Sequence, residues 1–215
     1  MTTTLIRKKL AYIYQQQQDF LILDSETTGL GNCEVIELAI INLAGETLLN
    51  QRIKPNGIIS DGASNIHGIT HKDLVSSPTL PNLWGKIKDI LDGKCLLIYN
   101  ADFDLKAIAS SLKAWGIKSP FITRYTCMMH LYSQFVGEKG LYAGSYKWQR
   151  LPGGDHTALG DCQATLKILR KMSEVLDADN YVFTGIDISS PFEYQYVPPK
   201  QPIMSFDDFV GLYPF

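Results

Sequence analysis

Apolar residues gather in short runs that alternate with polar segments containing glycine or proline along most of the chain. Runs of this length that are rich in Ile, Leu and Val predict buried β-strands. Ala44-Gly45 is typical of a turn between two of them. Strands are expected at Phe20–Ser25, Val35–Asn42, Thr47–Ile53, Cys95–Tyr99 and Phe121–Thr126.

Other stretches repeat apolar residues every three or four positions, which indicates helices with one buried face. The clearest is Thr157–Leu176, in which Cys162, Leu166 and Leu169 share a face. Residues 137–154 are rich in glycine and aromatic residues and predict neither a helix nor a strand. Further helices are expected at Thr2–Gln18, Asp61–Ile66, Thr70–Val75, Pro81–Leu91, Phe103–Trp115 and Cys127–Phe135.

The order of these elements predicts an α/β domain. Three strands that can form an antiparallel meander come first, and later strands alternate with helices, so a mixed sheet flanked by helices is expected. We expect residues 1–18 to be a leading helix and connector and residues 19–178 to be the domain. Residues 179–215 contain five prolines and predict an extended C-terminal tail that is a candidate partner-docking segment.

Composition narrows the classes of protein that the chain can represent. A chain of 215 residues with 45% hydrophobic content can bury one sizeable core. No apolar run has the length of a membrane-spanning helix, and the N-terminus lacks the pattern of a secretory signal. We therefore expect a cytoplasmic protein without membrane association. The four cysteines form no CxxC pair, which predicts free thiols rather than a zinc site.

Charge is distributed unevenly along the chain. Residues 1–172 carry 19 basic and 15 acidic side chains, whereas residues 173–215 carry one basic and seven acidic ones. A mildly basic body is compatible with a polyanionic substrate. An ordinary solvated surface with an acidic tail explains the same charges, so charge alone does not identify a ligand.

Two carboxylates stand at the end of the first predicted strand. Asp24 and Glu26 are two residues apart and should project from the same face, because side chains alternate along a strand. Adjacent carboxylates near a core repel each other, and a hard divalent cation with oxygen ligands neutralises them. A strand end with a capping aspartate is the ordinary alternative explanation.

Two further segments carry acids at helix starts. Asp102 and Asp104 follow the strand at Cys95–Tyr99, where capping also explains an acid. His156 and Asp161 lie at the start of the last helix, five residues apart, so the histidine is expected on the glycine-rich approach and facing the acid. Four carboxylates from three elements and one histidine suit phosphodiester hydrolysis with two metal ions. Because an imidazole titrates near neutrality, it can accept the proton of the attacking water.

These segments resemble a known family. DSETTG, NADFD and HTALGD, taken in order, are similar to the three exonuclease motifs of the DEDDh group in the DnaQ-like superfamily, and the similarity extends over roughly residues 18–175. The resemblance implies a ribonuclease H-like fold and 3′→5′ hydrolysis that releases nucleoside 5′-monophosphates. It also implies two Mg²⁺ or Mn²⁺ ions held by Asp24, Glu26, Asp104 and Asp161, with His156 as the general base.

The same resemblance implies contacts with the substrate. Thr27, Thr28 and Leu30 match the segment that holds the 3′-terminal nucleotide, and Leu30 matches a wedge against the bases. Asn100 matches an asparagine before the second motif, and NIHGIT places His67 near the substrate channel. Tyr99 departs from the pattern, because relatives often carry histidine there.

The tail contains one short motif. QPIMSF, Gln201–Phe206, resembles the sliding-clamp peptide that follows the exonuclease domain in the epsilon proofreading subunit of bacterial DNA polymerase III. An extended peptide of this kind docks Met204 and Phe206 in a pocket, while Gln201 sets the register. The alternative is that these apolar residues fold back onto the domain.

Several functions remain open at this stage. The first is an exonuclease on 3′ ends of single-stranded DNA, and the second is an exoribonuclease on short RNA, because no residue that recognises a 2′-hydroxyl is apparent. A non-catalytic module that binds nucleic acid or a partner protein would show a lost carboxylate or histidine, and all five positions are intact. A phosphatase on free nucleotides would need a closed pocket, which a sequence does not reveal.

Overall fold

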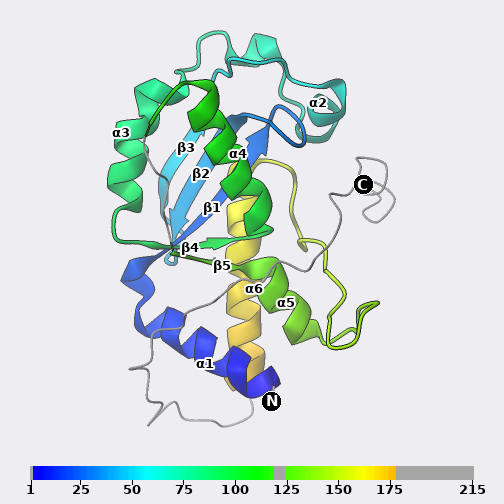
Figure 1. Ribbon diagram of the computed structural model, residues 1–215. Helices are drawn as coiled ribbons and strands as arrows, with labels where there is room; N and C mark the ends of the chain where they lie inside the picture. The colour runs from blue at the N-terminus through cyan, green and yellow to red at the C-terminus, as the bar shows by residue number, and fades with distance from the viewer. Residues whose placement is uncertain (1, 119–123, 178–215) are drawn as a thin grey trace. The chain divides into compact units, whose positions relative to one another are not determined.

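A computed structural model describes residues 2–118 and 124–177, all within one compact unit that is built on a five-stranded sheet. The strand order is β3-β2-β1-β4-β5, and Figure 1 shows these strands with the helices around them. The first three strands pair antiparallel, whereas β4 and β5 run parallel to β1, so the sheet is mixed as predicted. The strands are β1 (Phe20–Thr27), β2 (Val35–Asn42), β3 (Thr47–Arg52), β4 (Cys95–Ile98) and β5 (Arg124–Cys127).

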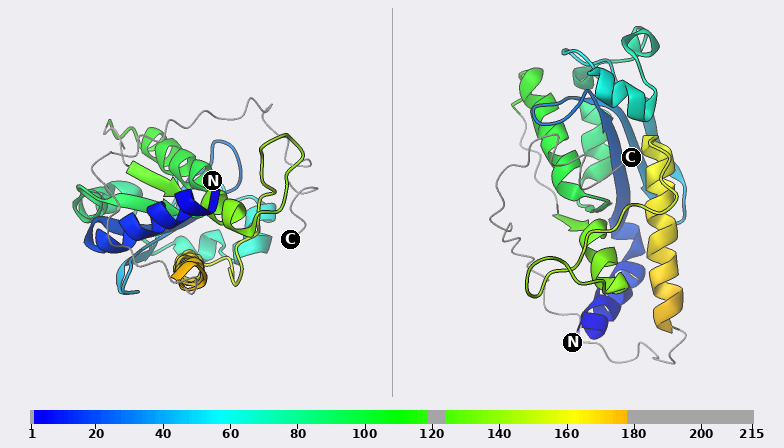
Figure 2. Two further views of the ribbon diagram at one scale, coloured as in Figure 1. Left: turned by 90° about the horizontal axis from the view of Figure 1, so that it is seen from below. Right: turned by 90° about the vertical axis from the view of Figure 1, so that its right-hand side faces the viewer.

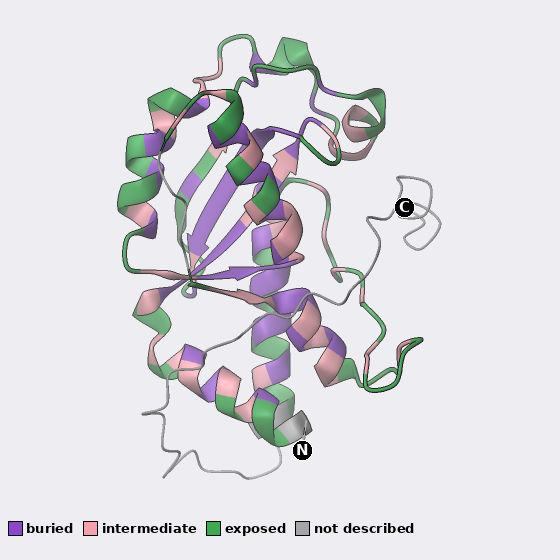
Figure 3. Cartoon of the chain, viewed as in Figure 1, coloured by how far each residue is buried: buried purple, intermediate pink, exposed green. Residues whose placement is uncertain are grey.

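Burial along the strands follows their position in the sheet. Nearly every residue of β1 and β2 is buried, whereas β3, at the edge, alternates exposed polar residues with the buried Leu49 (Figure 3). Strands covered on both faces become apolar throughout, and an edge strand keeps a solvated side. The continuous apolar pattern of β1 is therefore that of a central strand, and Asp24 and Glu26 interrupt it near its C-terminal end.

Helices cover both faces of the sheet, as the right-hand view of Figure 2 shows. Apolar residues of α1, α5 and α6 pack with Phe20 and Ile22 on one face. Residues of α3 and α4 pack with Leu21 and Leu23 on the other face. The helices are α1 (Thr2–Gln15), α2 (Asp61–His67), α3 (Leu80–Leu91), α4 (Ala101–Ala114), α5 (Met128–Val136) and α6 (Ala158–Asp177).

The leading helix is an integral part of this core. Ile6, Leu10 and Ile13 of α1 are buried in the cluster that also contains residues of α5 and α6. Figures 1 and 2 both place α1 beside the C-terminal part of α6. The helix ends at Gln15, the first of four successive glutamines, and a short 3-10 turn, η1 (Gln17–Asp19), leads into β1.

Other element boundaries differ modestly from those predicted. β1 continues to Thr27, two residues beyond the predicted end, so Glu26 as well as Asp24 lies within the strand. The segment expected to be a helix at Thr70–Val75 is a 3-10 helix, η2 (His71–Leu74). Residues 137–154, to which the sequence assigned no element, contain no helix and carry one isolated bridge between Lys139 and Tyr146. The start of the strand predicted at Phe121 lies outside the described residues, as does the whole 179–215 segment with Gln201–Phe206.

Two predictions about the chemistry of the chain can be compared with the structure. Cys33, Cys95, Cys127 and Cys162 all carry free thiols, as predicted. Within residues 2–118 and 124–177, every helix is too short or too polar to cross a membrane.

Candidate active site

The site begins on β1, where the alternation of side chains selects one face of the sheet. Asp24 and Glu26 have the same parity as Phe20 and Ile22, which pack on the face covered by α6. β4 pairs with β1 only from Phe20 to Ile22, so the edge of β1 at the two carboxylates is not paired with β4. The C-terminal part of β1 can therefore be approached from α4 as well as from α6.

The turn between β4 and α4 brings a third carboxylate to this edge. Asn100 precedes α4 with φ of 70°, a left-handed conformation that asparagine tolerates better than most residues. Asp104 in the first turn of α4 is buried, and its Oδ1 accepts a hydrogen bond of 2.7 Å from Ser25 Oγ. Ser25 thus holds Asp104 from the strand position between Asp24 and Glu26.

The loop before α6 is shaped by hydrogen bonds around His156, whose φ is 59°. Asp155 Oδ1 accepts bonds from the backbone N–H and the hydroxyl of Thr157, at 3.0 and 2.8 Å, and so encloses His156 in a tight turn. The backbone N–H of Asp155 donates to Asp161 Oδ1 at 2.9 Å. The carboxylate of Asp161 therefore fixes the loop that precedes α6.

Two glycines permit this close approach of loop and helix. A Cβ atom at Gly160 would collide with the carboxylate of Asp155, and one at Gly154 would lie 2.9 Å from Asp161 Oδ1. Gly154, just before DHTALGD, and Gly160, within it, are thus explained by the small space at the start of α6.

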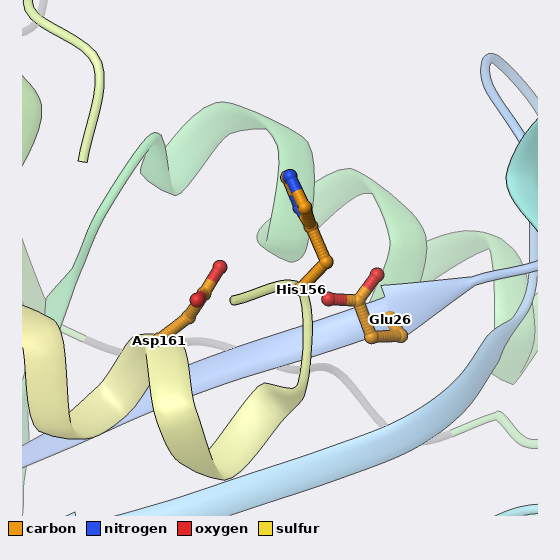
Figure 4. A group of neighbouring side chains, drawn as sticks. All are labelled: Glu26, His156 and Asp161. Atoms are coloured by element: carbon orange, nitrogen blue, oxygen red, sulfur yellow. The ribbon is translucent and has the colours of Figure 1, made fainter. Parts of the chain in front are cut away.

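Three of the predicted residues converge closely. Glu26, His156 and Asp161 each offer a ligand atom within 4.8 Å of the others. Figure 4 shows that they come from β1, from the loop and from α6. Asp24 and Asp104 belong to the same electrostatic cluster, because the charges of Asp104 and Asp161 act on Asp24. The structure thus brings Glu26, His156 and Asp161 together and places Asp24 and Asp104 within range of the charge of Asp161.

The pKa values of the four carboxylates in the cluster are all raised. Burial, followed by the charges of Asp104 and Asp161, raises the pKa of Asp24 well above its usual range. Burial and then Asp161 raise the pKa of Glu26 to about 9. Burial raises the pKa of Asp104 to about 7, although the Ser25 hydrogen bond opposes the rise, and burial also raises the pKa of Asp161. The ionised forms of these buried carboxylates are unfavourable without a nearby positive charge. A site for hard divalent cations would supply that charge.

The structure adds one acidic residue that the sequence analysis missed. Glu37 on β2 lies directly opposite Glu26 in the antiparallel ladder and is largely buried. Its Oε2 accepts the backbone N–H of Ala158 at 2.9 Å, and its Oε1 lies 3.4 Å from Arg52 Nε. The signal in the sequence was a single acid inside the apolar run VIELAII, which is costly to bury without partners.

The residues predicted to contact substrate lie next to this cluster. Thr27 Oγ1 donates to the carbonyl of Gly29 at 2.7 Å, and Thr28 Oγ1 accepts the backbone N–H of Glu34 at 2.9 Å. These bonds shape the loop after β1. Leu30 on that loop is 43% exposed, and such exposure is compatible with a contact to a base.

His67 is committed to contacts within the protein. Its Nδ1 accepts the backbone N–H of Ile69 at 3.0 Å, so the proton resides on Nε2, which donates to the carbonyl of Thr27 at 3.1 Å. Burial lowers the pKa of His67, consistent with a neutral ring. In this conformation, His67 fixes the end of β1, and Asn100 provides the turn into α4.

Comparisons with known proteins agree on the family. Residues 21–169 match the RNase_T model, described as an exonuclease. The chain is 34% identical over 175 residues to the uncharacterized exonuclease CP81 of Escherichia phage 186, covering 74% of this chain and 90% of that protein. It is 31% identical over 99 residues to the DNA polymerase III epsilon subunit of Buchnera aphidicola subsp. Schizaphis graminum, covering 41% of this chain and 42% of that protein. It is 24% identical over 179 residues to RNA exonuclease 4 of Mycosarcoma maydis, covering 75% of this chain and 45% of that protein.

Solved structures agree on the fold. The nuclease domain of 3′hExo, a DEDDh family member bound to rAMP, matches with a TM-score of 0.53 and 18% identity over 72% of this chain and 92% of that chain. The cell-death related nuclease 4 matches with a TM-score of 0.55 and 22% identity, over 73% of this chain and 64% of that chain. These matches confirm the predicted ribonuclease H-like α/β fold. The chain belongs to the exonuclease family defined by the RNase_T model, within the DnaQ-like superfamily.

Proposed function

We propose that this nuclease is a DEDDh 3′→5′ exonuclease that removes nucleotides from the 3′ end of single-stranded nucleic acid. The observation that carries the proposal is the convergence of Glu26, His156 and Asp161 from three separate segments. Asp24 and Asp104 stand in the same cluster, so every residue type that this chemistry needs is present.

Asp24, Glu26, Asp104 and Asp161 would hold two divalent cations, Mg²⁺ or Mn²⁺. The fit rests on their chemistry, because hard cations prefer carboxylate oxygens and because burial beside other carboxylates raises the pKa values of these groups. When bound, such ions polarise the scissile phosphate and stabilise the attacking and leaving oxygens.

His156 is the general base of the proposal. A nitrogen of its ring lies within 4.8 Å of a carboxylate oxygen of Glu26 and of Asp161, and in the proposal this ring takes the proton of the attacking water. The water oxygen forms a bond to phosphorus as the bond to the O3′ atom of the preceding nucleotide breaks. The products are a nucleoside 5′-monophosphate and a strand that is shorter by one nucleotide.

The loop after β1 would hold the 3′-terminal nucleotide. Thr27 and Thr28 fix this loop through their hydroxyl groups, and Leu30 on the same loop presents an exposed apolar side chain. His67 and Asn100 would assist by fixing the backbone at the ends of β1 and β4. The wedge of Leu30 against the terminal base stays a prediction.

DNA is the favoured substrate of the proposal, and RNA is the alternative. The relatives that match this chain bear names of both kinds, an epsilon subunit of DNA polymerase III and an RNA exonuclease. The proposed sliding-clamp contact at Gln201–Phe206 rests on its motif alone.

The test is degradation of matched DNA and RNA oligonucleotides labelled at the 5′ or the 3′ end, with Mg²⁺, Mn²⁺ or EDTA. A metal-dependent ladder from the 5′ label that Asp24→Ala abolishes supports the proposal, and the ratio of DNA to RNA rates selects the substrate. Absence of cleavage under every condition contradicts it and favours a non-catalytic binding module.

A further inference from the structure

The segment between α5 and α6 forms a hairpin, defined here as residues 138–150, that is ordered by its own hydrogen bonds. Lys139 and Tyr146 form an antiparallel bridge, and the backbone N–H of Lys147 donates to the carbonyl of Glu138 at 2.9 Å. Gly144 at the turn has φ of 78°, which suits glycine. Figure 1 shows the hairpin projecting from the helices in yellow-green, and both views of Figure 2 agree.

The base of the hairpin is attached beside the candidate active site. The hydroxyl of Tyr99, which directly precedes Asn100, donates to the carbonyl of Gln149 at 2.7 Å. The ring of Trp148 lies 6.1 Å from that of His130 on α5. From this base, the chain runs through residues 151–155 to His156. The hairpin connects α5 and α6, which cover the sheet face toward which Asp24 and Glu26 point.

The hairpin exposes large side chains that proteins usually bury, two at its tip and one, Trp148, at its base. Leu141 is 93% exposed, Tyr142 is 68% exposed and Trp148 is 36% exposed. Hydrophobic side chains that gather at a raised, ordered structure mark an interaction surface more often than single scattered ones do.

Basic side chains are interleaved with these rings. Lys139, Lys147 and Arg150 lie on the hairpin, whereas Glu138 is its only acid and pairs with Lys147 at 2.8 Å. Lys139 lies over the ring of Tyr146 at 5.4 Å from its centre. The hairpin therefore carries an excess of positive charge together with exposed aromatic area.

We propose that the hairpin binds the single strand on the 5′ side of the nucleotide that is removed, with Tyr142 stacking on a base and Arg150 contacting a phosphate. This inference rests on the proposed exonuclease function. Alternating rings and cations are what unspecific binding of single strands requires, because every base has a π-face and every nucleotide has a phosphate. A docking site for a protein is the weaker explanation, because lysine is depleted in the cores of protein–protein interfaces.

The test compares a trinucleotide with a strand of about 20 nucleotides, because only the longer one can reach the hairpin while its 3′ end occupies the site. The double variant Tyr142→Ala/Arg150→Ala should raise KM for the long strand by about tenfold and leave kcat and KM for the trinucleotide unchanged. The KM of the double variant for the long strand should also depend less steeply on salt concentration than that of the wild type. The matched control is Lys86→Ala on α3, which removes an exposed cation on the opposite face of the sheet. It should leave kcat and KM for both substrates unchanged.

Two outcomes overturn the proposal. An unchanged KM for the long strand in the double variant shows that the hairpin does not touch nucleic acid, and equal losses on both substrates assign the effect to the site itself. Binding of a fluorescent strand of about 20 nucleotides, measured by anisotropy in EDTA, separates the two proposals. If the wild type cleaves nothing but the double variant loses binding, then the hairpin proposal stands while the catalytic one fails.

Discussion

Glu37 on β2 accepts a hydrogen bond from the backbone N–H of Ala158, the first residue of α6, at 2.9 Å across the sheet–helix boundary. The first N–H groups of a helix have no partner within it, so a buried carboxylate satisfies one of them and favours one position for the helix start. His156 and Asp161 lie just before and just after Ala158. Glu37 thereby couples β2 to the geometry of both residues.

Glu37→Ala should lower kcat by tenfold or more through displacement of His156, because even small misplacements of a catalytic group are costly. Glu37→Gln retains an acceptor oxygen for Ala158 and should restore part of that loss. The measurement is kcat and KM on a short oligonucleotide, with thermal melting as a check of folding. A purely structural role would lower the melting temperature of both variants and leave the kcat of the folded fraction intact.

The metal-free protein should lose stability as pH rises. The pKa of Glu26 is raised in the folded state from 4.5 to about 9, so the folded state binds protons more tightly than the unfolded state. The stabilisation is complete below pH 4.5 and is lost as the pH rises toward about 9. Thermal melting in EDTA across this window should show the decline, and Mn²⁺ should reverse it at high pH. A melting temperature in EDTA that increases over the same pH range would contradict the burial of the Glu26 carboxylate.

His156→Asn should slow hydrolysis by about 10²–10⁴-fold by removing the general base. Asparagine is chosen because it tolerates the positive φ of this position, so the loop should keep its shape. Mn²⁺ should still raise the melting temperature of the variant, since the four carboxylates remain. Loss of that metal effect would reassign His156 from base to ligand.

Gly160→Ala should reduce activity by moving the loop that carries His156. Its Cβ would collide with the Asp155 carboxylate, which holds Thr157 and the turn around His156. The matched control is Gly85→Ala in α3, where a Cβ meets no neighbour. That control should keep full activity and gain up to about 1 kcal/mol in the free energy of unfolding, because alanine favours a helix interior. Equal activity of the two variants would show that the Asp155 turn does not position the site.

Deletion of residues 195–215 should leave the rate on short oligonucleotides unchanged if the segment only recruits a partner. Binding of a bacterial sliding clamp to the full chain, measured by calorimetry, should then be lost with the deletion or with Met204→Ala/Phe206→Ala. If the deleted protein fails to fold, then the segment packs on the domain instead. If the full chain does not bind a clamp, then the resemblance of Gln201–Phe206 to a clamp peptide is coincidental.

Local sequence determined the elements and the carboxylates that they carry. The alternation along β1 placed Asp24 and Glu26 on one face, and the apolar period of the last helix placed the buried Cys162, Leu166 and Leu169 toward the sheet. Strand and helix periodicities are properties of neighbouring residues, so they can be recognised without knowledge of the fold. The ends of elements were less predictable, as the longer β1 shows, because propensity changes gradually there.

Tertiary structure alone decided which distant side chains support the cluster. Ser25 bonds Asp104 across 79 residues of chain, and Glu37 bonds Ala158 across 121. The commitment of both His67 nitrogens to the backbone depends on a loop that folds back on β1. These partners meet because strand register and helix packing bring them together, and no local pattern encodes that meeting. The sequence therefore determined the chemistry that the protein carries, and the packing of α4 and α6 against β1 and β2 determined how its charged groups are held in place.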